Sequence, residues 1–198
     1  MAKGPRYSLP FRRRREGKTD YRLRRRLIVS RKPTIVIRKS LNHMTAQLVK
    51  AETIGDKVIA AAHSKELARD YGWGAGCGNI PAAYLTGLLC GYKAREKGVK
   101  EAVLDVGLYS TSKESRVFAA LKGFIDAGIE VAHDDKVLPD EARVEGQHIA
   151  NYAAKLAASD KEIYSRVFSG YLKAHMPPEE IHKHFAEVKD KIASSFEK

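Results

Sequence analysis

The apolar positions in the first half of the chain are spaced as they are in β-strands. A short β-branched run at 34–37 is typical of a strand, and similar runs follow at 45–51 and 58–62. A turn signal at Gly55-Asp56 separates the second run from the third. Because short links usually join strands that are neighbours in space, these three runs predict an antiparallel meander.

A helical pattern replaces the strand pattern at Asn79. Asn79 is a residue type that caps helices, Pro81 suits the first turn, and Gly98 marks an end, so one long helix is predicted. Gly87 and Gly91 lie four residues apart and therefore on one face of this helix. That face is expected to approach the backbone of a neighbouring element closely.

A strand–helix–strand unit follows the long helix. A strand is predicted at 102–106, and Thr111 has Glu114 three residues later, which is the spacing of a capping box. The helix that would start there runs to Gly128, and a strand at 129–132 follows. Short links imply that the two strands are parallel, with a right-handed crossover. Together with the meander, this unit predicts an α/β fold with a mixed sheet flanked by helices.

The chain beyond Pro139 has a helical pattern. An alanine-rich helix is predicted at 147–158, and Pro177-Pro178 opens a final helix. An apolar stripe runs along that last helix and consists of Ile181, Phe185, Val188, Ile192 and Phe196. Most amphipathic helices pack on their own domain, so the stripe is expected to pack on the core rather than on a partner.

Charge is distributed much less evenly than hydrophobicity. Residues 1–40 contain 15 Lys/Arg and two acids, a net charge of +13, whereas the other residues contain 21 Lys/Arg and 22 acids and sum to −1. A block of like charge resists packing, so residues 1–32 are expected to form an arm that stays extended and disordered until it meets opposite charge. The commonest such partner is the phosphate backbone of a nucleic acid. The chain is thus divided into this arm, an α/β core at 33–138 and a helical extension at 139–198.

The arm combines arginines with aromatic side chains. Guanidinium groups match phosphate oxygens and also stack on bases, and aromatic rings stack on unpaired bases, so the mixture favours folded RNA. The arm residues expected to contact RNA are Arg6, Tyr7, Arg12, Arg13, Arg14, Arg15, Lys18, Tyr21, Arg22, Arg24, Arg25, Arg26, Arg31 and Lys32. Membrane-surface binding is a minor alternative, because only Leu23, Leu27 and Ile28 offer an apolar face there.

Glycine occupies every second position from Gly72 to Gly78, directly before the long helix. Helix N-termini bind phosphate, but a Walker loop ends in Gly-Lys-Ser/Thr, whereas Asn79 follows Gly78 here. A dinucleotide site would need a strand directly before the loop, and the segment 67–71 is predicted to be helical. Two interpretations stay open: a flexible loop that approaches RNA with Trp73 stacking on a base, and a plain surface turn.

The acidic residues do not form the cluster that a metal-dependent nuclease needs. Two-metal catalysis requires three or four converging carboxylates, and the three predicted meander strands contain none. Asp105 is expected to be a turn or capping acid, and Asp134 and Asp135 are expected to lie in a loop. His182 and His184 would point to nearly opposite faces of a helix, which predicts a solvated surface rather than joint metal binding. No catalytic constellation is found, and no metal or cofactor is expected.

The cysteines and the apolar segments favour a soluble, intracellular protein. Cys77 and Cys90 are too few for a disulfide framework and lack the paired spacing of a zinc site, so reduced thiols are expected. No apolar stretch follows the positive start of the chain, so no signal peptide is expected. The longest apolar stretch, at 80–92, is shorter than the roughly 20 residues that cross a membrane.

Four stretches of the chain, taken together and in order, are characteristic of one protein family. They are GPRYSLPFRRRREGKTDYRLRRRL (4–27), KPTIVIRKSLNHMTAQLV (32–49), GWGAGCGNIPAAYLTGLLCGYKA (72–94) and LDVGLYSTSKESRVFAALKGFIDAGI (104–129). With these stretches the chain resembles the large-subunit ribosomal protein family that binds 5S rRNA, number eighteen in the bacterial series, in its archaeal and eukaryotic-type branch. Bacterial members are shorter, so the region after about Pro139 belongs to the longer branch.

The resemblance implies a ribonuclease-H-like core without nuclease chemistry. It implies a non-enzymatic, cytoplasmic constituent of the central protuberance that attaches 5S rRNA to 23S rRNA and touches neighbouring ribosomal proteins. It also implies RNA contacts in the core at Arg38, Ser40, His43, Gln47, Tyr109 and Arg116. At one turn the chain departs from the bacterial pattern, because Val106-Gly107-Leu108 replaces Arg-Gly-Gly.

Two alternatives come from other functional classes. One is a general RNA-binding chaperone, in which the arm binds all folded RNA alike, so that it differs from the ribosomal interpretation only in specificity. The other is a nucleotide-dependent enzyme that uses the loop at 72–79. No small-molecule substrate is expected under the ribosomal interpretation.

Overall fold

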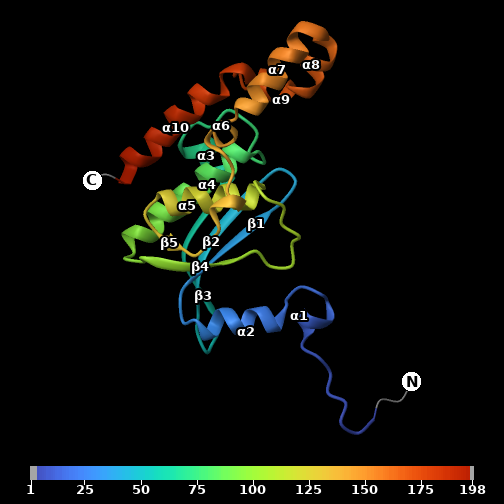
Figure 1. Ribbon diagram of the computed structural model, residues 1–198, viewed down its shortest axis with the longest axis vertical. Coiled ribbons are helices and arrows are strands. Elements are labelled where there is room, and N and C mark those ends of the chain that lie inside the picture. Colours follow the sequence, from blue (N-terminus) through green and yellow to red (C-terminus); the bar gives the residue numbers. More distant parts are fainter. Residues whose placement is uncertain (1–3, 197–198) are drawn as a thin grey trace.

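The structure, a computed structural model, describes residues 4–196 (Figure 1). Among these residues a sheet of five strands forms the centre, in the order β3-β2-β1-β4-β5. The strands are β1 (Thr34–Lys39), β2 (Met44–Ala51), β3 (Asp56–His63), β4 (Glu101–Asp105) and β5 (Glu130–Val131). Strands β1 to β3 pair antiparallel, whereas β4 pairs parallel with both β1 and β5. The predicted meander, parallel pair and mixed α/β fold are confirmed.

The helices are divided among the arm, the core and the C-terminal part. They are α1 (Arg12–Arg15), α2 (Tyr21–Val29), α3 (Ser64–Asp70), α4 (Ile80–Glu96), α5 (Arg116–Asp126), α6 (Glu141–Val144), α7 (Gln147–Ser159), α8 (Lys161–Val167), α9 (Ser169–Lys173) and α10 (Ile181–Phe196), with 3-10 turns at Asp135–Val137 and Pro178–Glu180. Within residues 4–196, no helix is both long enough and apolar enough to cross a membrane.

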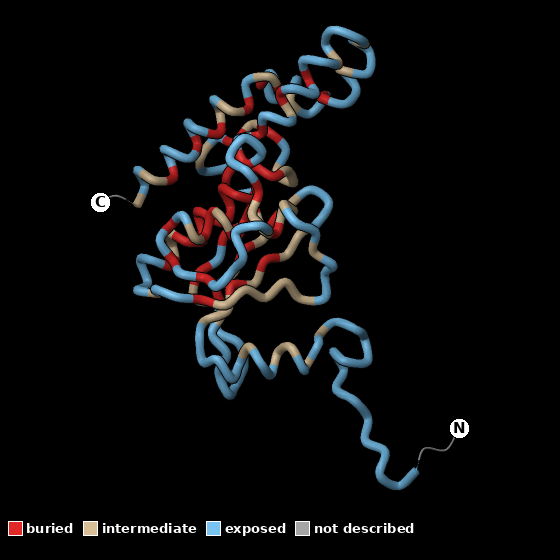
Figure 2. Tube along the Cα trace, viewed as in Figure 1, coloured by how far each residue is buried: buried red, intermediate tan, exposed pale blue. Residues whose placement is uncertain are grey.

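The sheet is fully buried on one face only. Ile35 and Ile37 of β1 and Leu48 of β2 are 0% exposed, because this face packs against α4 and α5. The alternate residues on the other face, such as Val36 and Gln47, are half-buried. Figure 2 shows the buried residues gathered around α4, α5 and the strands they cover. The second face is therefore open for contacts with the arm and with a partner.

Helices α4 and α5 meet through glycines, as the sequence predicts. A Cβ atom at Gly87 would lie 1.8 Å from the Ala120 carbonyl oxygen, and one at Gly91 would lie 2.5 Å from the Ala127 Cβ. Asn79 caps α4 with its side chain, as expected. The two backbones can approach this closely only because no side chain stands between them.

The predicted capping box before α5 is wrong. Helix α5 begins at Arg116, so Thr111 lies in the preceding loop. Glu114 has a φ of +55° and donates its backbone N–H to the Val137 carbonyl over 2.9 Å. This contact with the segment after β5 holds the backbone in a conformation that cannot enter a helix.

The turn between β2 and β3 lies slightly earlier than expected. Glu52 and Gly55 exchange backbone hydrogen bonds of 3.1 and 3.2 Å. Asp56, which was predicted to lie in the turn, is the first residue of β3. Its carboxylate is therefore held at the end of the sheet, where the arm passes.

The C-terminal stripe packs on the core, as predicted. Ile181, Phe185, Val188 and Ile192 of α10 are at most 4% exposed. Helices α7 to α9 project away from the sheet, and most of their residues are exposed (Figures 1 and 2). The C-terminal part thus has one end built into the core and one end in solvent.

The arm is not extended throughout, which corrects the expectation from its charge. Residues 12–15 and 21–29 are helical. Asp20 caps the second helix, because its carboxylate accepts hydrogen bonds from the backbone N–H groups of Arg22 and Leu23. No residue of either helix is buried. Local capping therefore outweighs charge repulsion, while the arm remains outside the hydrophobic core.

Candidate nucleic-acid interface

The cations of the arm lie on the surface. Of the arm residues predicted to contact RNA, all are exposed except Tyr21 and Arg24, which are half-buried. Ion pairs within the described part of the arm and with the sheet engage Arg12, Lys18, Arg24 and Lys32. The other arginines of the arm form no ion pair within residues 4–196, so their charges are available to an anionic partner.

Arg24 fastens α2 to the end of β3. Its Nη1 and Nη2 donate to the two carboxylate oxygens of Asp56 over 2.9 and 2.6 Å, which is a forked ion pair. These hydrogen bonds lower the pKa of Asp56 and raise the pKa of Arg24. Because both side chains are partly exposed, the pair adds little to stability. It does fix where the arm crosses the sheet.

Arg38 is held against the turn that follows β4. Its Nη1 donates to the Asp105 carbonyl over 2.9 Å, and its Nη2 donates to the Asp105 carboxylate over 3.1 Å. The same carboxylate accepts a hydrogen bond of 2.7 Å from the Gly107 N–H, which confirms Asp105 as a turn acid. A Cβ atom at Gly107 would lie 3.1 Å from the Arg38 guanidinium carbon. The turn at Val106-Gly107-Leu108, which departs from the bacterial pattern, therefore packs against the Arg38 guanidinium group.

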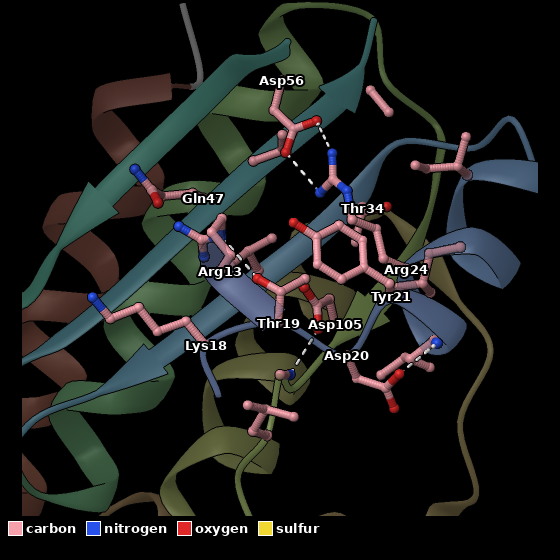
Figure 3. A pocket seen from close by; sticks show the side chains of 18 of the residues that line it. Arg13, Lys18, Thr19, Asp20, Tyr21, Arg24, Thr34, Gln47, Asp56 and Asp105 are labelled. Carbon is pink, nitrogen blue, oxygen red and sulfur yellow. Dashed lines mark hydrogen bonds and ion pairs between the residues drawn. The ribbon is translucent and has the colours of Figure 1, made fainter. Parts of the chain in front are cut away.

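Between α2 and the open face of the sheet lies a cavity of about 590 Å³ (Figure 3). Its walls come from the arm, from β1 to β3 and from the turn after β4. Predicted RNA-contacting residues in the wall are Arg13, Lys18, Tyr21, Arg24, Arg38 and Gln47. The sequence placed these six residues in two separate segments, and the fold brings them around one hollow.

Ser40 and His43 form the tight turn between β1 and β2. The Ser40 hydroxyl donates to the His43 carbonyl and accepts from the His43 N–H, each over 3.0 Å. The His43 Nδ1 lies 3.2 Å from the buried Ser64 hydroxyl. The turn is therefore rigid, and Ser40 remains exposed at its tip.

Arg116 joins this turn to the glycine segment. Its Nη1 donates to the carbonyl groups of Ser40, Leu41 and Gly78, with a shortest distance of 2.8 Å to Gly78. A Cβ atom at Gly78 would lie 2.7 Å from the Leu41 carbonyl oxygen. Arg116 thus positions two loops, a role that its family resemblance did not suggest.

Tyr109 lies at the same end of the sheet as the turn between β1 and β2, and its ring is exposed. Its side chain is 41% exposed, and the neighbouring Leu108 is 56% exposed. The Lys39 ammonium group lies 5.6 Å from the centre of the Tyr109 ring. A ring held over a cation but open to solvent can stack on a base.

Trp73 does not face a partner, so its prediction as an RNA-stacking residue is wrong. The side chain is 3% exposed, and its ring stacks on His184 with centroids 5.1 Å apart. Met176 and Tyr171 lie within 4 Å of Cβ positions built on the glycines that follow Trp73. The C-terminal helices therefore cover the glycine segment. A covered segment gives no support to the hypothesis of a nucleotide-dependent enzyme that uses this loop.

The expected solvated histidine surface is also wrong. His184 accepts a hydrogen bond of 3.0 Å from the Gly74 N–H through Nε2, and burial lowers the pKa of its imidazole. The Nδ1 atom of His182 is buried and has no hydrogen-bond partner among the described residues. Both residues are half-buried, because the packing around α10 overrides the pattern of the isolated helix.

Carboxylates do not converge into a catalytic site in the described chain. Asp134 caps the short 3-10 turn that contains Asp135, whereas Asp105 is the last residue of β4 and its carboxylate binds the turn that follows. Within residues 4–196, no group of three or more His, Cys, Asp and Glu side chains could hold a metal ion. Cys77 and Cys90 are free, and burial raises the pKa of the Cys90 thiol to about 12.

Comparison with known families shows a match to the ribosomal large subunit proteins 60S L5 and 50S L18. The match covers residues 5–101 and 92–134, which contain both helices of the arm, α1 and α2, and all five strands of the sheet. The chain belongs to this family. It is therefore a large-subunit ribosomal protein, cytoplasmic and ribosome-bound, that acts in translation as an rRNA-binding component of a ribonucleoprotein.

Family membership also fixes the broad class of partners. A large-subunit protein of this kind contacts rRNA and neighbouring ribosomal proteins. The family is one of structural ribosomal proteins and not of enzymes. Residues after 134 lie outside the match, so the C-terminal helices are the part of the chain that the family describes least.

The structure adds residues that sequence reasoning did not select. Thr34 and Asp56 line the cavity beside the predicted RNA-contacting residues. The strand alternation could have indicated Thr34, because it lies two residues before Val36 on the open face. No sequence signal could have indicated Asp56, because its partner Arg24 is 32 positions away.

Proposed function

We propose that this protein binds 5S rRNA and helps to attach it to 23S rRNA in the central protuberance of the large subunit. The observation that carries the proposal is the joint presence of a family match over residues 5–134 and an exposed arm with nearly all of the net positive charge. Phosphate contacts from such an arm supply affinity, and polar groups of a folded core supply selectivity. Residues 1–32, 33–138 and 139–198 are proposed as the arm, core and extension.

We infer that the core has a ribonuclease-H-like arrangement. The three antiparallel strands followed by two parallel strands, in the order β3-β2-β1-β4-β5, support this inference. The scattered positions of Asp105, Asp134 and Asp135 agree with a core that carries no nuclease chemistry.

The proposed RNA contacts fall into direct and indirect groups. Direct contacts are assigned to the exposed arm cations and to Tyr21, Ser40, His43, Gln47 and Tyr109. Arg24, Arg38 and Arg116 already bind carboxylates or carbonyl groups within the protein. These three arginines are assigned the role of positioning the arm and loops for RNA.

The test is competition binding of the full chain to 5S rRNA against tRNA at two salt concentrations. We expect a preference for 5S rRNA that persists at the higher salt, because shape-selective contacts are less sensitive to salt than phosphate contacts. Equal affinities that fall together with salt would instead identify a general RNA-binding chaperone and overturn the proposal.

A further inference from the structure

The cavity between α2 and the sheet is lined by half-buried polar side chains that have no hydrogen-bond partner in the described protein. The Gln47 amide, the Thr34 hydroxyl and the Tyr21 hydroxyl all line it. Within the described chain, none of these three groups forms a side-chain hydrogen bond. Figure 3 shows Tyr21 between the arm and the sheet, with Gln47 further along β2. Polar groups left open around one hollow are suited to a polar ligand.

The size and walls of the cavity match a small planar ligand. Its volume of about 590 Å³ lies within the roughly 300–1,000 Å³ of typical ligand sites. Leu23 and Leu27 of α2 and Val36 and Val49 of the sheet supply apolar surface, and Tyr21 supplies an aromatic ring. Such walls can cover both faces of a base while its edge meets polar groups.

The charges in the wall leave a place for a phosphate. Arg24 and Arg38 are neutralised by Asp56 and Asp105, respectively. Arg13, in contrast, donates through Nε to the neutral Thr19 hydroxyl over 2.8 Å and forms no ion pair within residues 4–196. The positive charge of the Arg13 guanidinium group is therefore available to an anion in the cavity.

We propose that this cavity holds one unstacked nucleotide of the rRNA, with its base against Tyr21 and its phosphate at Arg13. The inference rests on the proposed function, since it names which part of an RNA partner enters the protein. Sequence-specific RNA recognition targets bases that are splayed out of loops and bulges. The Gln47 amide presents a donor beside an acceptor, which matches the N6–H and N7 edge of adenine. The expected occupant is therefore an unpaired adenosine nucleotide.

The first experiment compares two RNAs and two matched substitutions in the full chain. Affinity is measured for 5S rRNA and for a fully paired RNA duplex of the same length, at one salt concentration. Thr34→Val removes a hydroxyl inside the cavity, and Thr45→Val makes the same change on the same sheet face outside it. We expect Thr34→Val to weaken 5S rRNA binding severalfold and Gln47→Leu to weaken it about tenfold, since each removes a hydrogen bond. Thr45→Val should leave both affinities unchanged.

The outcomes separate this inference from the proposed function. If the wild-type chain prefers 5S rRNA but Thr34→Val and Gln47→Leu bind it as tightly, the nucleotide site is overturned and the proposed function stands. If both variants lose affinity equally for 5S rRNA and the duplex, the cavity does not read an unpaired base, and the site is again overturned. A wild-type chain without preference for 5S rRNA contradicts the proposed function itself. Circular dichroism of each variant verifies that the fold is retained.

A second measurement identifies the source of the nucleotide. Ultraviolet crosslinking of the wild-type complex with 5S rRNA should attach a nucleotide to the peptide that contains Tyr21, because an unpaired base stacked on the ring lies in direct contact with it. Crosslinks confined to other peptides would overturn the site. In a second experiment, the free chain is titrated with AMP and with CMP, and binding is followed through the NMR signals of the Gln47 amide. Tight AMP binding without any Tyr21 crosslink would identify a free-nucleotide site and overturn the RNA assignment.

Discussion

At the scale of single residues, three guanidinium groups connect segments that are distant in the sequence. Arg24 joins the arm to β3, Arg38 joins β1 to the turn after β4, and Arg116 joins α5 to two loops. Each group is partly exposed, so its contribution to stability is small. Its contribution is geometric, because it fixes the spacing of the surfaces that we propose as RNA contacts.

Two glycine-to-alanine substitutions test the contact between α4 and α5. Gly87→Ala should lower the free energy of unfolding by about 1–3 kcal/mol or more, because its Cβ would lie 1.8 Å from the Ala120 carbonyl oxygen. Gly170→Ala in α9 meets no atom within 4 Å and should be neutral or raise stability by up to about 1 kcal/mol. Urea unfolding of both variants checks this. Equal stabilities would contradict the packing described here.

His184 should make stability depend on pH. Its Nε2 accepts the Gly74 N–H, and burial lowers the imidazole pKa in the folded state below the ordinary value of 6.5. The unfolded chain therefore binds a proton first as the pH falls, so stability should decline below about pH 6.5 and level off below the lowered pKa. The measurement is urea unfolding between pH 7.5 and pH 5. His184→Gln, which can still accept the hydrogen bond, should reduce this decline, and an unaltered pH dependence would exclude His184 as its source.

At the scale of elements, α10 and α2 differ in how they are attached. Helix α10 inserts a stripe of apolar side chains into the core, whereas α2 has no buried residue and is held mainly by the Arg24–Asp56 ion pair and a partly apolar face over a cavity. Burial of apolar surface is the stronger of these attachments. The C-terminal helix should therefore unfold with the core, and the arm helix should open independently of it.

A substitution in α10 tests whether this helix belongs to the core. Ile192→Ala should destabilise the whole protein by about 2–5 kcal/mol, because Ile192 is 0% exposed. Lys191→Ala on the exposed face should change stability by less than about 0.5 kcal/mol. Denaturant unfolding should give one shared transition in each case. A separate transition for the C-terminal helices in the Ile192→Ala variant would show instead that the extension folds alone.

At the scale of the whole molecule, charge and hydrophobic burial are segregated. The arm carries the excess positive charge, and the sheet with α4, α5 and α10 carries the buried residues. Since residues 4–32 of the arm include no buried residue, the charges there are free of the core's packing requirements. Affinity and stability should therefore be separable by experiment.

Removal of residues 1–32 should weaken binding to 5S rRNA by orders of magnitude while the core stays folded. If about eight arm side chains neutralise phosphates, the slope of log affinity against log salt should be roughly −6 to −7 for the full chain and much smaller for the truncated one. Filter binding at several salt concentrations measures both slopes, and thermal unfolding serves as the control for folding. Full affinity after truncation would show that the core alone carries the binding.

The sequence by itself determined the features that depend on neighbouring residues. The charged arm, the meander, the Asn79 cap and the glycine face of α4 were all predicted, because capping, alternation and helical spacing act over a few positions. The α10 stripe belongs to the same class, since its period alone indicated a buried face. The family could likewise be inferred from ordered local motifs.

Only the tertiary structure decided which side chains remain available to a partner. Trp73 was predicted to face RNA and is instead covered by His184, 111 positions further along the chain. Arg24 binds Asp56, and Tyr21 lines the same cavity as the open face of the sheet, which no local pattern specifies. The cavity exists because the arm helix is held beside the sheet without being buried in it. Long-range packing fixes such distances, and a sequence pattern read over a few residues does not contain them.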